Sequence, residues 1–265
     1  MKELFLLFLI CLSALTLGSV VRADTHMTAP EALTLLKSGN ARFASGNALH
    51  PRVSFSRIGE TAEIGQKPYA TVLAASDSRV PLEAIFDQGI GDIFAIRVLG
   101  NVVDTDQAGS IEYGIAHLNT PLLVVLGNSQ CEAVSSVAER VPFSGNLSPL
   151  LENIVPAIER AVLRHPRLEG PELLPHAIEE NVSQSISDLL RISPVASLKV
   201  EDGELLIVGG VYQVESGRIK WLSKHPQVRM LEERGRQARH QAAVEAAAEA
   251  ARAARLPRPS NAKPN

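Results

Sequence analysis

Three short apolar runs constrain the fold of this chain more than any other feature of its sequence. They read YATVLAA at 69–75, DIFAIRV at 92–98 and PLLVVLG at 121–127. Runs of β-branched and aliphatic residues without polar alternation are typical of strands that are covered on both faces. Segments with helical character lie between these runs, at 81–88 and 107–118. The alternation predicts an α/β fold in which a central, mainly parallel sheet is flanked by helices.

The chain on either side of these runs is predicted to add helices and a hairpin. Thr28 and Glu31 have the spacing of a capping box, which predicts a short amphipathic helix before Gly39, followed by a polar loop to Lys67. A tight-turn signature at 215–217 predicts that the two apolar runs around it pair as strands. Those strands are expected at 204–214 and 218–222, and further helices at 131–140, 147–163 and 171–190.

The two ends of the chain differ in character from its middle. Residues 1–23 combine Lys2, an apolar run and small or aliphatic residues at 21–23, which is the pattern of a signal peptide cleaved after Ala23. A membrane anchor is the alternative, but the run is shorter than the roughly 20 residues that a spanning helix needs. We therefore expect a secreted or periplasmic protein with no membrane contact after cleavage. The main domain is expected at 24–229, before an Ala/Arg/Glu-rich helical tail at 230–265 that ends in a Pro-rich disordered segment.

Charge and cysteine content limit the partners of the chain. It has 26 Lys and Arg against 29 Asp and Glu, a net charge of −3. Since there is no basic surplus, nucleic acid is not an expected partner. Of the two cysteines, only Cys131 remains after cleavage at Ala23, so an intramolecular disulfide is excluded.

Polar segments follow two of the predicted strands. ASDSR at 75–79 ends the first run, and GNSQC at 127–131 follows the third. Ligands gather at the carboxyl ends of the strands in an open parallel sheet, so we expect these two segments to lie close together. Asp77 and Arg79 can form a bidentate pair that keeps the carboxylate charged. Taken alone, such a pair is more simply explained as a structural ion pair.

From about residue 31 to residue 222, the chain resembles the β-class carbonic anhydrases. The resemblance rests on ASDSRVPLEAIFDQGIGDIFAIRVLGNVV and on GSIEYGIAHLNTPLLVVLGNSQCEAV. It implies a β-carbonic-anhydrase-like fold and the activity of a carbonate dehydratase, a lyase that interconverts CO2 and bicarbonate. In the family, a Cys-Ser-Asp-Ser-Arg signature and a His-x-x-Cys signature supply zinc with two cysteines and one histidine. At those three ligand positions this chain has Ala75, Asn128 and Cys131, of which only Cys131 matches.

The resemblance also implies roles for four other residues. Asp77 and Arg79 match the catalytic dyad that orients the zinc-bound hydroxide, or that in some members releases its Asp to block the zinc. Gln66 and Phe94 match substrate-binding positions of the small apolar pocket. Val98 departs from the family, because an Asn is common at that position.

The loss of two ligands is serious for zinc chemistry. Zinc catalysis needs three protein ligands and an open position for water, whose pKa the ion lowers to about 7. The methyl group of Ala75 has no lone pair, and the amide oxygen of Asn128 is a hard, neutral donor that suits zinc poorly beside a thiolate. The histidines show no short ligand spacing. We therefore expect no bound zinc and no other cofactor.

Cys131 itself allows two interpretations. At the start of a predicted helix, the macrodipole can lower the pKa of its thiol and raise its reactivity. The alternative is an inert, buried thiol left from a lost zinc site, and this is favoured because no base is placed to activate it.

Three hypotheses for function follow. The leading one is an exported, β-carbonic-anhydrase-like pseudoenzyme that has lost zinc binding and CO2 hydration and keeps a pocket for a small anion such as bicarbonate. The second is an active or residual carbonic anhydrase with a non-standard metal site. The third is a structural or assembly role, since the resemblance implies a homodimer or a higher homo-oligomer.

Overall fold

A five-stranded sheet forms the centre of the computed structural model, which describes residues 27–255 and their side chains as far as 248. The strand order is β2-β1-β3-β4-β5, with the first four strands parallel and the last antiparallel to β4. The strands are β1 (Ala70–Ala75), β2 (Ile93–Val98), β3 (Leu122–Asn128), β4 (Leu206–Tyr212) and β5 (Ile219–Trp221). The predicted mainly parallel sheet and its C-terminal hairpin are therefore confirmed. The predicted signal peptide lies outside the described residues.

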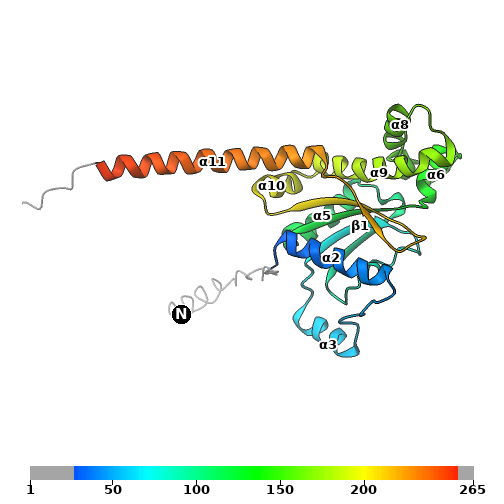
Figure 1. The fold of residues 1–265 in the computed structure, drawn as a ribbon, viewed down its shortest axis with the longest axis horizontal. Coiled ribbons are helices and arrows are strands. Elements are labelled where there is room, and N and C mark those ends of the chain that lie inside the picture. Colours follow the sequence, from blue (N-terminus) through cyan, green and yellow to red (C-terminus); the bar gives the residue numbers. More distant parts are fainter. Residues whose placement is uncertain (1–26, 256–265) are drawn as a thin grey trace, which may run out of the picture.

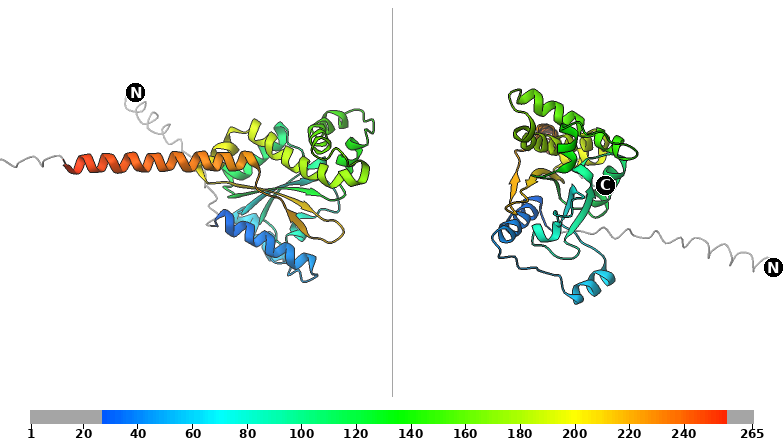
Figure 2. Two further views of the ribbon diagram at one scale, coloured as in Figure 1. Left: turned by 45° about the horizontal axis from the view of Figure 1, so that its top comes forward. Right: turned by 90° about the vertical axis from the view of Figure 1, so that its right-hand side faces the viewer.

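Helices cover both faces of the sheet, as Figures 1 and 2 show. One face packs against α2 and α4, and the other packs against a larger layer that includes α5, α6 and α9. Every residue of β1 and β3 is buried, which explains their continuous apolar sequences. The helices are α2 (Ala29–Ala44), α3 (Phe55–Ile64), α4 (Leu82–Ile85), α5 (Thr105–Glu112), α6 (Glu132–Ala138), α7 (Leu147–Glu152), α8 (Val155–Arg164), α9 (Gly170–Ile192), α10 (Pro194–Asp202) and α11 (Pro226–Arg255), with a 3-10 turn η1 (Leu99–Asn101) and a π-helical turn η2 (Tyr113–His117).

The predicted capping box at the start of α2 is present. The backbone N–H and the hydroxyl of Thr28 both donate to the carboxylate of Glu31, at 2.8 and 2.6 Å. The helix continues beyond the predicted stop at Gly39 as far as Ala44. Gly39 stays helical because it packs directly on α4, where a Cβ atom at this position would lie 1.8 Å from the carbonyl oxygen of Phe86.

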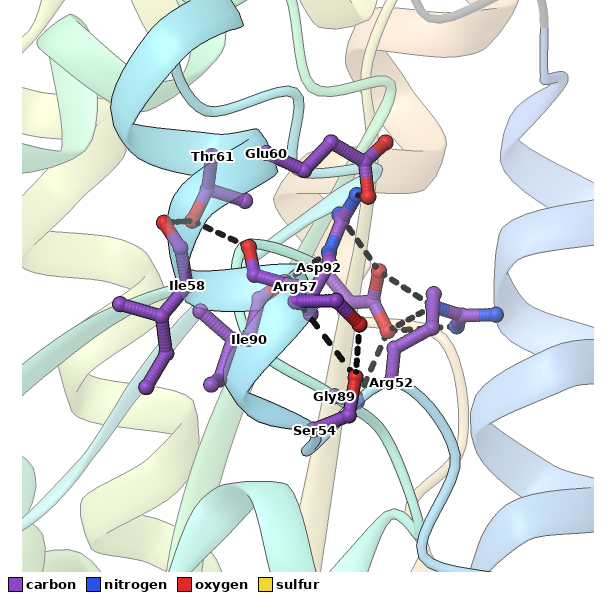
Figure 3. Close-up of polar contacts among 10 residues, drawn as sticks. Arg52, Ser54, Arg57, Ile58, Glu60, Thr61, Gly89, Ile90 and Asp92 are labelled. Carbon is purple, nitrogen blue, oxygen red and sulfur yellow. Dashed lines mark hydrogen bonds and ion pairs between the residues drawn. The ribbon is translucent and has the colours of Figure 1, made fainter.

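The prediction of a polar loop as far as Lys67 is wrong, because this segment contains the helix α3. Polar contacts attach this segment to the body, as Figure 3 shows. Arg52 donates from Nε to both carboxylate oxygens of Asp92, at 3.0 and 2.9 Å, and Arg57 donates from Nε to the carbonyl of Ile90 at 2.9 Å. No residue of α3 is buried. A helix attached by charged groups leaves no core-facing apolar stripe in the sequence, which is why the pattern missed it.

Two further differences concern helix boundaries. The helix predicted at 147–163 is two helices, α7 and α8, and the unpredicted α10 follows α9 directly. Ser193 begins α10 by accepting a hydrogen bond from the N–H of Ala196 at 3.1 Å, and Pro194 occupies its first position.

The helical tail begins at Pro226, four residues before the boundary expected from composition. Its first turns pack on the body through the buried side chains of Val228 and Leu231. Arg234 pairs with Glu201 of α10, and Gly235 lies so close to α10 that a Cβ atom would sit 1.7 Å from the carbonyl oxygen of Glu201. The remainder of α11 projects away from the body (Figures 1 and 2). None of the helices between residues 27 and 255 combines the length and apolar character needed to cross a membrane.

Candidate functional site

The carboxyl ends of β1 and β3 meet at one edge of the sheet, as expected for parallel neighbours. The two strands pair directly from Thr71↔Leu123 to Ala74↔Leu126. The loops that follow them enclose a hollow of about 290 Å³. Its lining residues are Ala75, Ser76, Asp77, Ser78, Arg79, Leu99, Gly100, Asn128, Cys131, Glu132 and Ala133. The structure therefore brings Ala75, Asp77, Arg79, Asn128 and Cys131 together.

The carboxylate of Asp77 accepts four hydrogen bonds at this edge. Its Oδ1 accepts from the backbone N–H and the Nε–H of Arg79, at 2.9 and 3.0 Å. Its Oδ2 accepts from Nη2 of Arg79 at 2.7 Å and from Nδ2 of Asn128 at 3.3 Å. The side-chain hydrogen bonds from Arg79 lower the pKa of Asp77, against the opposing effect of burial. An ionised carboxylate offers about four lone-pair sites, so all of those on Asp77 are engaged.

A second set of contacts holds Arg79 from the other side. Nη1 donates to Oε1 of Gln130 at 2.9 Å, and Nη2 donates to the carbonyl of Gln130 at 3.0 Å. Gln130 in turn donates from Nε2 to Glu215 at 2.7 Å. Sequence reasoning did not single out Gln130 or Glu215, because no local spacing links residues that are 85 positions apart.

Asn128 is completely buried at the end of β3. Its amide donates to Asp77, as described above, while its Oδ1 is buried and accepts no hydrogen bond from the described residues. Ala75, at the end of β1, is 2% exposed and presents only a methyl group. Both of the substituted ligand positions are thus filled by side chains that pack within the strand ends.

The thiol of Cys131 lies just before α6, where the sequence placed it at a helix start. Burial raises the pKa of this thiol, which agrees with the inert, buried thiol that the sequence favours and not with the alternative of a pKa lowered by the helix. Hydrogen bonds from the backbone N–H groups of Val134 and Ala133 act in the opposite direction but are outweighed. Cys131 is 4% exposed, which places it with buried structural thiols rather than with accessible, activated ones.

The donor set does not fit the zinc ion that the resemblance implies. A catalytic zinc site needs three protein ligands, whereas the three matching positions offer a methyl group, an amide that donates to Asp77, and a single thiol. Across residues 27–255, no cluster of three or more His, Cys, Asp or Glu side chains is arranged to hold a metal ion.

Gln66 and Phe94 lie away from the hollow. Gln66 is an exposed residue of the segment between α3 and β1. Phe94 is the second residue of β2 and pairs with Thr71 near the start of β1, at the opposite end of the strands from Ala75. Its ring lies 5.8 Å from that of Tyr113, measured between centroids. Within one chain, these two substrate-binding candidates are not brought to the dyad.

A polar contact from α9 fixes one wall of the hollow. Gly100, in the η1 turn, has a φ of 70°, and a Cβ atom there would lie 2.7 Å from Cδ1 of Ile154. The buried amide of Asn181 donates to the Gly100 carbonyl at 2.8 Å. The close approach requires glycine, and the hydrogen bond holds the turn in place.

We predict that Cys131 reacts slowly with iodoacetamide in the native chain. The raised pKa leaves less thiolate at pH 8 than in a free cysteine, and burial restricts access. Alkylation at Cys131, followed by peptide mass spectrometry, is expected to be at least about tenfold slower in the native chain than in urea. Equal rates in the two conditions would contradict this picture of the thiol.

Comparison with known proteins agrees with this architecture. The family model for carbonic anhydrase matches residues 70–219. Carbonic anhydrase 2 of Mycobacterium tuberculosis is 38% identical over 184 residues, which is 69% of this chain and 87% of that protein. The carbonic anhydrase of Mycolicibacterium smegmatis is 35% identical over 189 residues, covering 70% of this chain and 89% of that protein.

Two solved structures share the fold. The β-carbonic anhydrase CafA of Aspergillus fumigatus has a TM-score of 0.60 at 24% identity and covers 77% of this chain and 94% of its own. A structure described among two tetrameric β-carbonic anhydrases of Sordaria macrospora has a TM-score of 0.58 at 25% identity, with coverages of 71% and 94%. This chain therefore belongs to the β-class carbonic anhydrase family.

Proposed function

We propose that this member of the family is a pseudoenzyme that neither forms the zinc site nor hydrates CO2 through it. The observation that carries the proposal is the donor set at the three ligand positions, where Ala75 and Asn128 stand beside the single thiol of Cys131. Losing partners of metal ligands typically costs about 10–100-fold in metal affinity or activity, and losing two ligands is more severe.

The state of Asp77 supports the same proposal. Asp77 occupies the family's dyad position beside Cys131, yet Arg79 and Asn128 already donate to both of its oxygens. To bind a metal or to accept a proton, Asp77 would have to give up charge-assisted hydrogen bonds, each of which contributes about 1.5–3 kcal/mol.

The hollow is proposed to hold a small anion such as bicarbonate. Its volume exceeds that of such an ion, and the guanidinium of Arg79 is among the groups that line it. Arg97 donates from Nη2 to the backbone carbonyl of Asp77 at 2.6 Å, so its charge is held next to the loop that lines the hollow. The carboxylates of Asp77 and Glu132 oppose this charge, which limits the expected affinity.

Metal content and CO2 hydration test the loss of catalysis. We expect the purified wild-type chain to contain no stoichiometric zinc by mass spectrometry and to show no hydration in a stopped-flow assay. The double variant Ala75→Cys/Asn128→His restores a Cys₂His donor set and is expected to gain both. Each single variant is the matched control and is expected to gain little, because it supplies only two of the three ligands.

Stoichiometric metal with hydration activity in the wild type would overturn the proposal. That outcome would favour the alternative of an active carbonic anhydrase with a non-standard metal site, in keeping with the names of the Mycobacterium tuberculosis and Mycolicibacterium smegmatis relatives. A metal-free, inactive double variant that keeps the wild-type fold would show that more than the two ligand positions has diverged.

We propose that the chain assembles as a homo-oligomer. The tetrameric state named for the Sordaria macrospora relatives supports this proposal. The segment around α3 presents a surface suited to a second copy. Five large apolar side chains there are exposed, including Phe55 at 88%, while contacts such as Arg52 with Asp92 attach the segment to its own body. The exposed apolar residues are Leu49, Val53, Phe55, Ile58 and Ile64. A patch of this kind marks an interaction surface in a soluble protein.

Replacing Phe55 by Glu is expected to reduce the mass measured by light scattering at micromolar concentration. The new charge would have to be desolvated in a contact that buries Phe55, whereas the exposed site tolerates it in a monomer. Leu163→Glu is the matched control, since Leu163 is 80% exposed on α8, outside this patch. An unchanged mass for Phe55→Glu would exclude the α3 surface as the contact.

Export is proposed from the first 23 residues, which have the pattern of a signal peptide. N-terminal sequencing of the chain expressed in its own host is expected to begin at Asp24 and to find it outside the cytoplasm. An intact Met1 on the mature protein would contradict cleavage.

A further inference from the structure

The guanidinium of Arg79 is held between two groups that come from different parts of the chain. Asp77 accepts from Nε and Nη2 on one side. Gln130, in the loop between β3 and α6, accepts from Nη1 and Nη2 on the other side. Asp77 neutralises the charge of Arg79, but it does not explain why the chain provides a second, neutral acceptor for the same group.

The orientation of Gln130 depends on Glu215. Nε2 of Gln130 donates to Oε1 of Glu215 at 2.7 Å, and the hydroxyl of Ser129 donates to Oε2 at 3.0 Å. Hydrogen bonds from its own backbone N–H, from Gln130 and from Ser129 lower the pKa of Glu215. With its amide N–H committed to a carboxylate, Gln130 can only turn its oxygen toward Arg79.

The turn that carries Glu215 is itself fixed. The backbone N–H of Val214 donates to Oγ of Ser129 at 3.0 Å, which ties the turn to the loop after β3. Asn40 of α2 donates to the carbonyl of Gly217 at 2.8 Å and accepts from the N–H of Ile219 at 2.9 Å. The β4–β5 turn is therefore anchored on both sides, so it can act as a rigid support for Glu215.

We propose that Gln130 and Glu215 are positioning residues, which hold the Arg79 guanidinium closed on Asp77 and withhold its N–H groups from a molecule in the hollow. Four charged groups interact with this arrangement besides Arg79 itself: Asp77 in the same loop, Arg97 from β2, Glu132 at the start of α6 and Glu215 from the turn. Without the Gln130 side chain, the contact to Nη1 of Arg79 disappears, while the backbone carbonyl of residue 130 still accepts from Nη2. An anion in the hollow could then accept from Nη1 in place of the amide oxygen.

This inference rests on the proposed function in one respect, because it assumes that a small anion binds in the hollow. The contacts themselves involve no metal ligand position of the family, so the two proposals can fail separately.

Hydrogen exchange at the Arg79 side chain tests the inference on the full chain labelled with ¹⁵N. In the wild type, the Nε–H resonance of Arg79 is expected to exchange slowly. In Gln130→Ala and in Glu215→Ala, exchange is expected to accelerate tenfold or more, and the double variant is expected to add little because both act through one chain of contacts. Glu139→Gln is the control, since it removes an exposed carboxylate of the same charge at the end of α6.

A bicarbonate titration of the same samples supplies the second readout. Tighter binding in Gln130→Ala than in the wild type, together with faster exchange, supports the full inference. Faster exchange with no bicarbonate response in any variant supports the positioning role of Gln130 and Glu215. It contradicts the proposal that the hollow binds a small anion. Unchanged exchange in both single variants, with the fold intact by amide NMR spectra, overturns the inference.

Discussion

The hydrogen bonding of one carboxylate determines what the edge of this sheet can do. Asp77 accepts from three N–H groups of Arg79 and from the amide of Asn128. These contacts fix the guanidinium, the orientation of the buried amide and the conformation of the loop after β1. They also consume the lone pairs through which a carboxylate would bind a cation or accept a proton. The edge is thus stabilised by hydrogen bonds among its own side chains.

The fold was predictable from the sequence where burial alone decides the structure. β1 and β3 are covered on both faces, so their sequences are continuously apolar and their order along the chain implies parallel pairing. Prediction failed where contacts distant in sequence decide. The α3 helix depends on Arg52, Arg57 and Asp92, and the extension of α2 depends on the fit of Gly39 against Phe86. Neither contact leaves a periodic signal.

The candidate site divides in the same way. The rule that the carboxyl ends of parallel strands meet at one edge correctly predicted that Ala75, Asp77 and Asn128 lie close together, because this rule depends only on topology. For Cys131 the sequence left two interpretations, because a helix position does not report desolvation; burial raises the pKa of the thiol, in line with the inert thiol that was favoured. The contact between Gln130 and Glu215 was not predicted, because it joins a loop to a turn that lies 85 residues away in the sequence.

The buried amide of Asn128 also has an energetic consequence. Its Oδ1 is a buried polar atom with no hydrogen-bond donor among the described residues, and a buried acceptor that stays unsatisfied costs about 1–3 kcal/mol. An apolar residue of similar size at the end of β3 would avoid this cost, but Asp77 would then keep only the three donors of Arg79. The stability of this edge is therefore a balance between one unsatisfied acceptor and one saturated carboxylate. Asp77 is only partly buried, with 17% of its side chain exposed, but its carboxylate is charged. A hydrogen bond to a charged group is stronger than one between neutral groups, so the Asn128 amide on Asp77 offsets part of the cost of the orphaned oxygen. The strand end is thus ordered by hydrogen bonds among its own side chains, in which Asn128 and Arg79 share the carboxylate of Asp77.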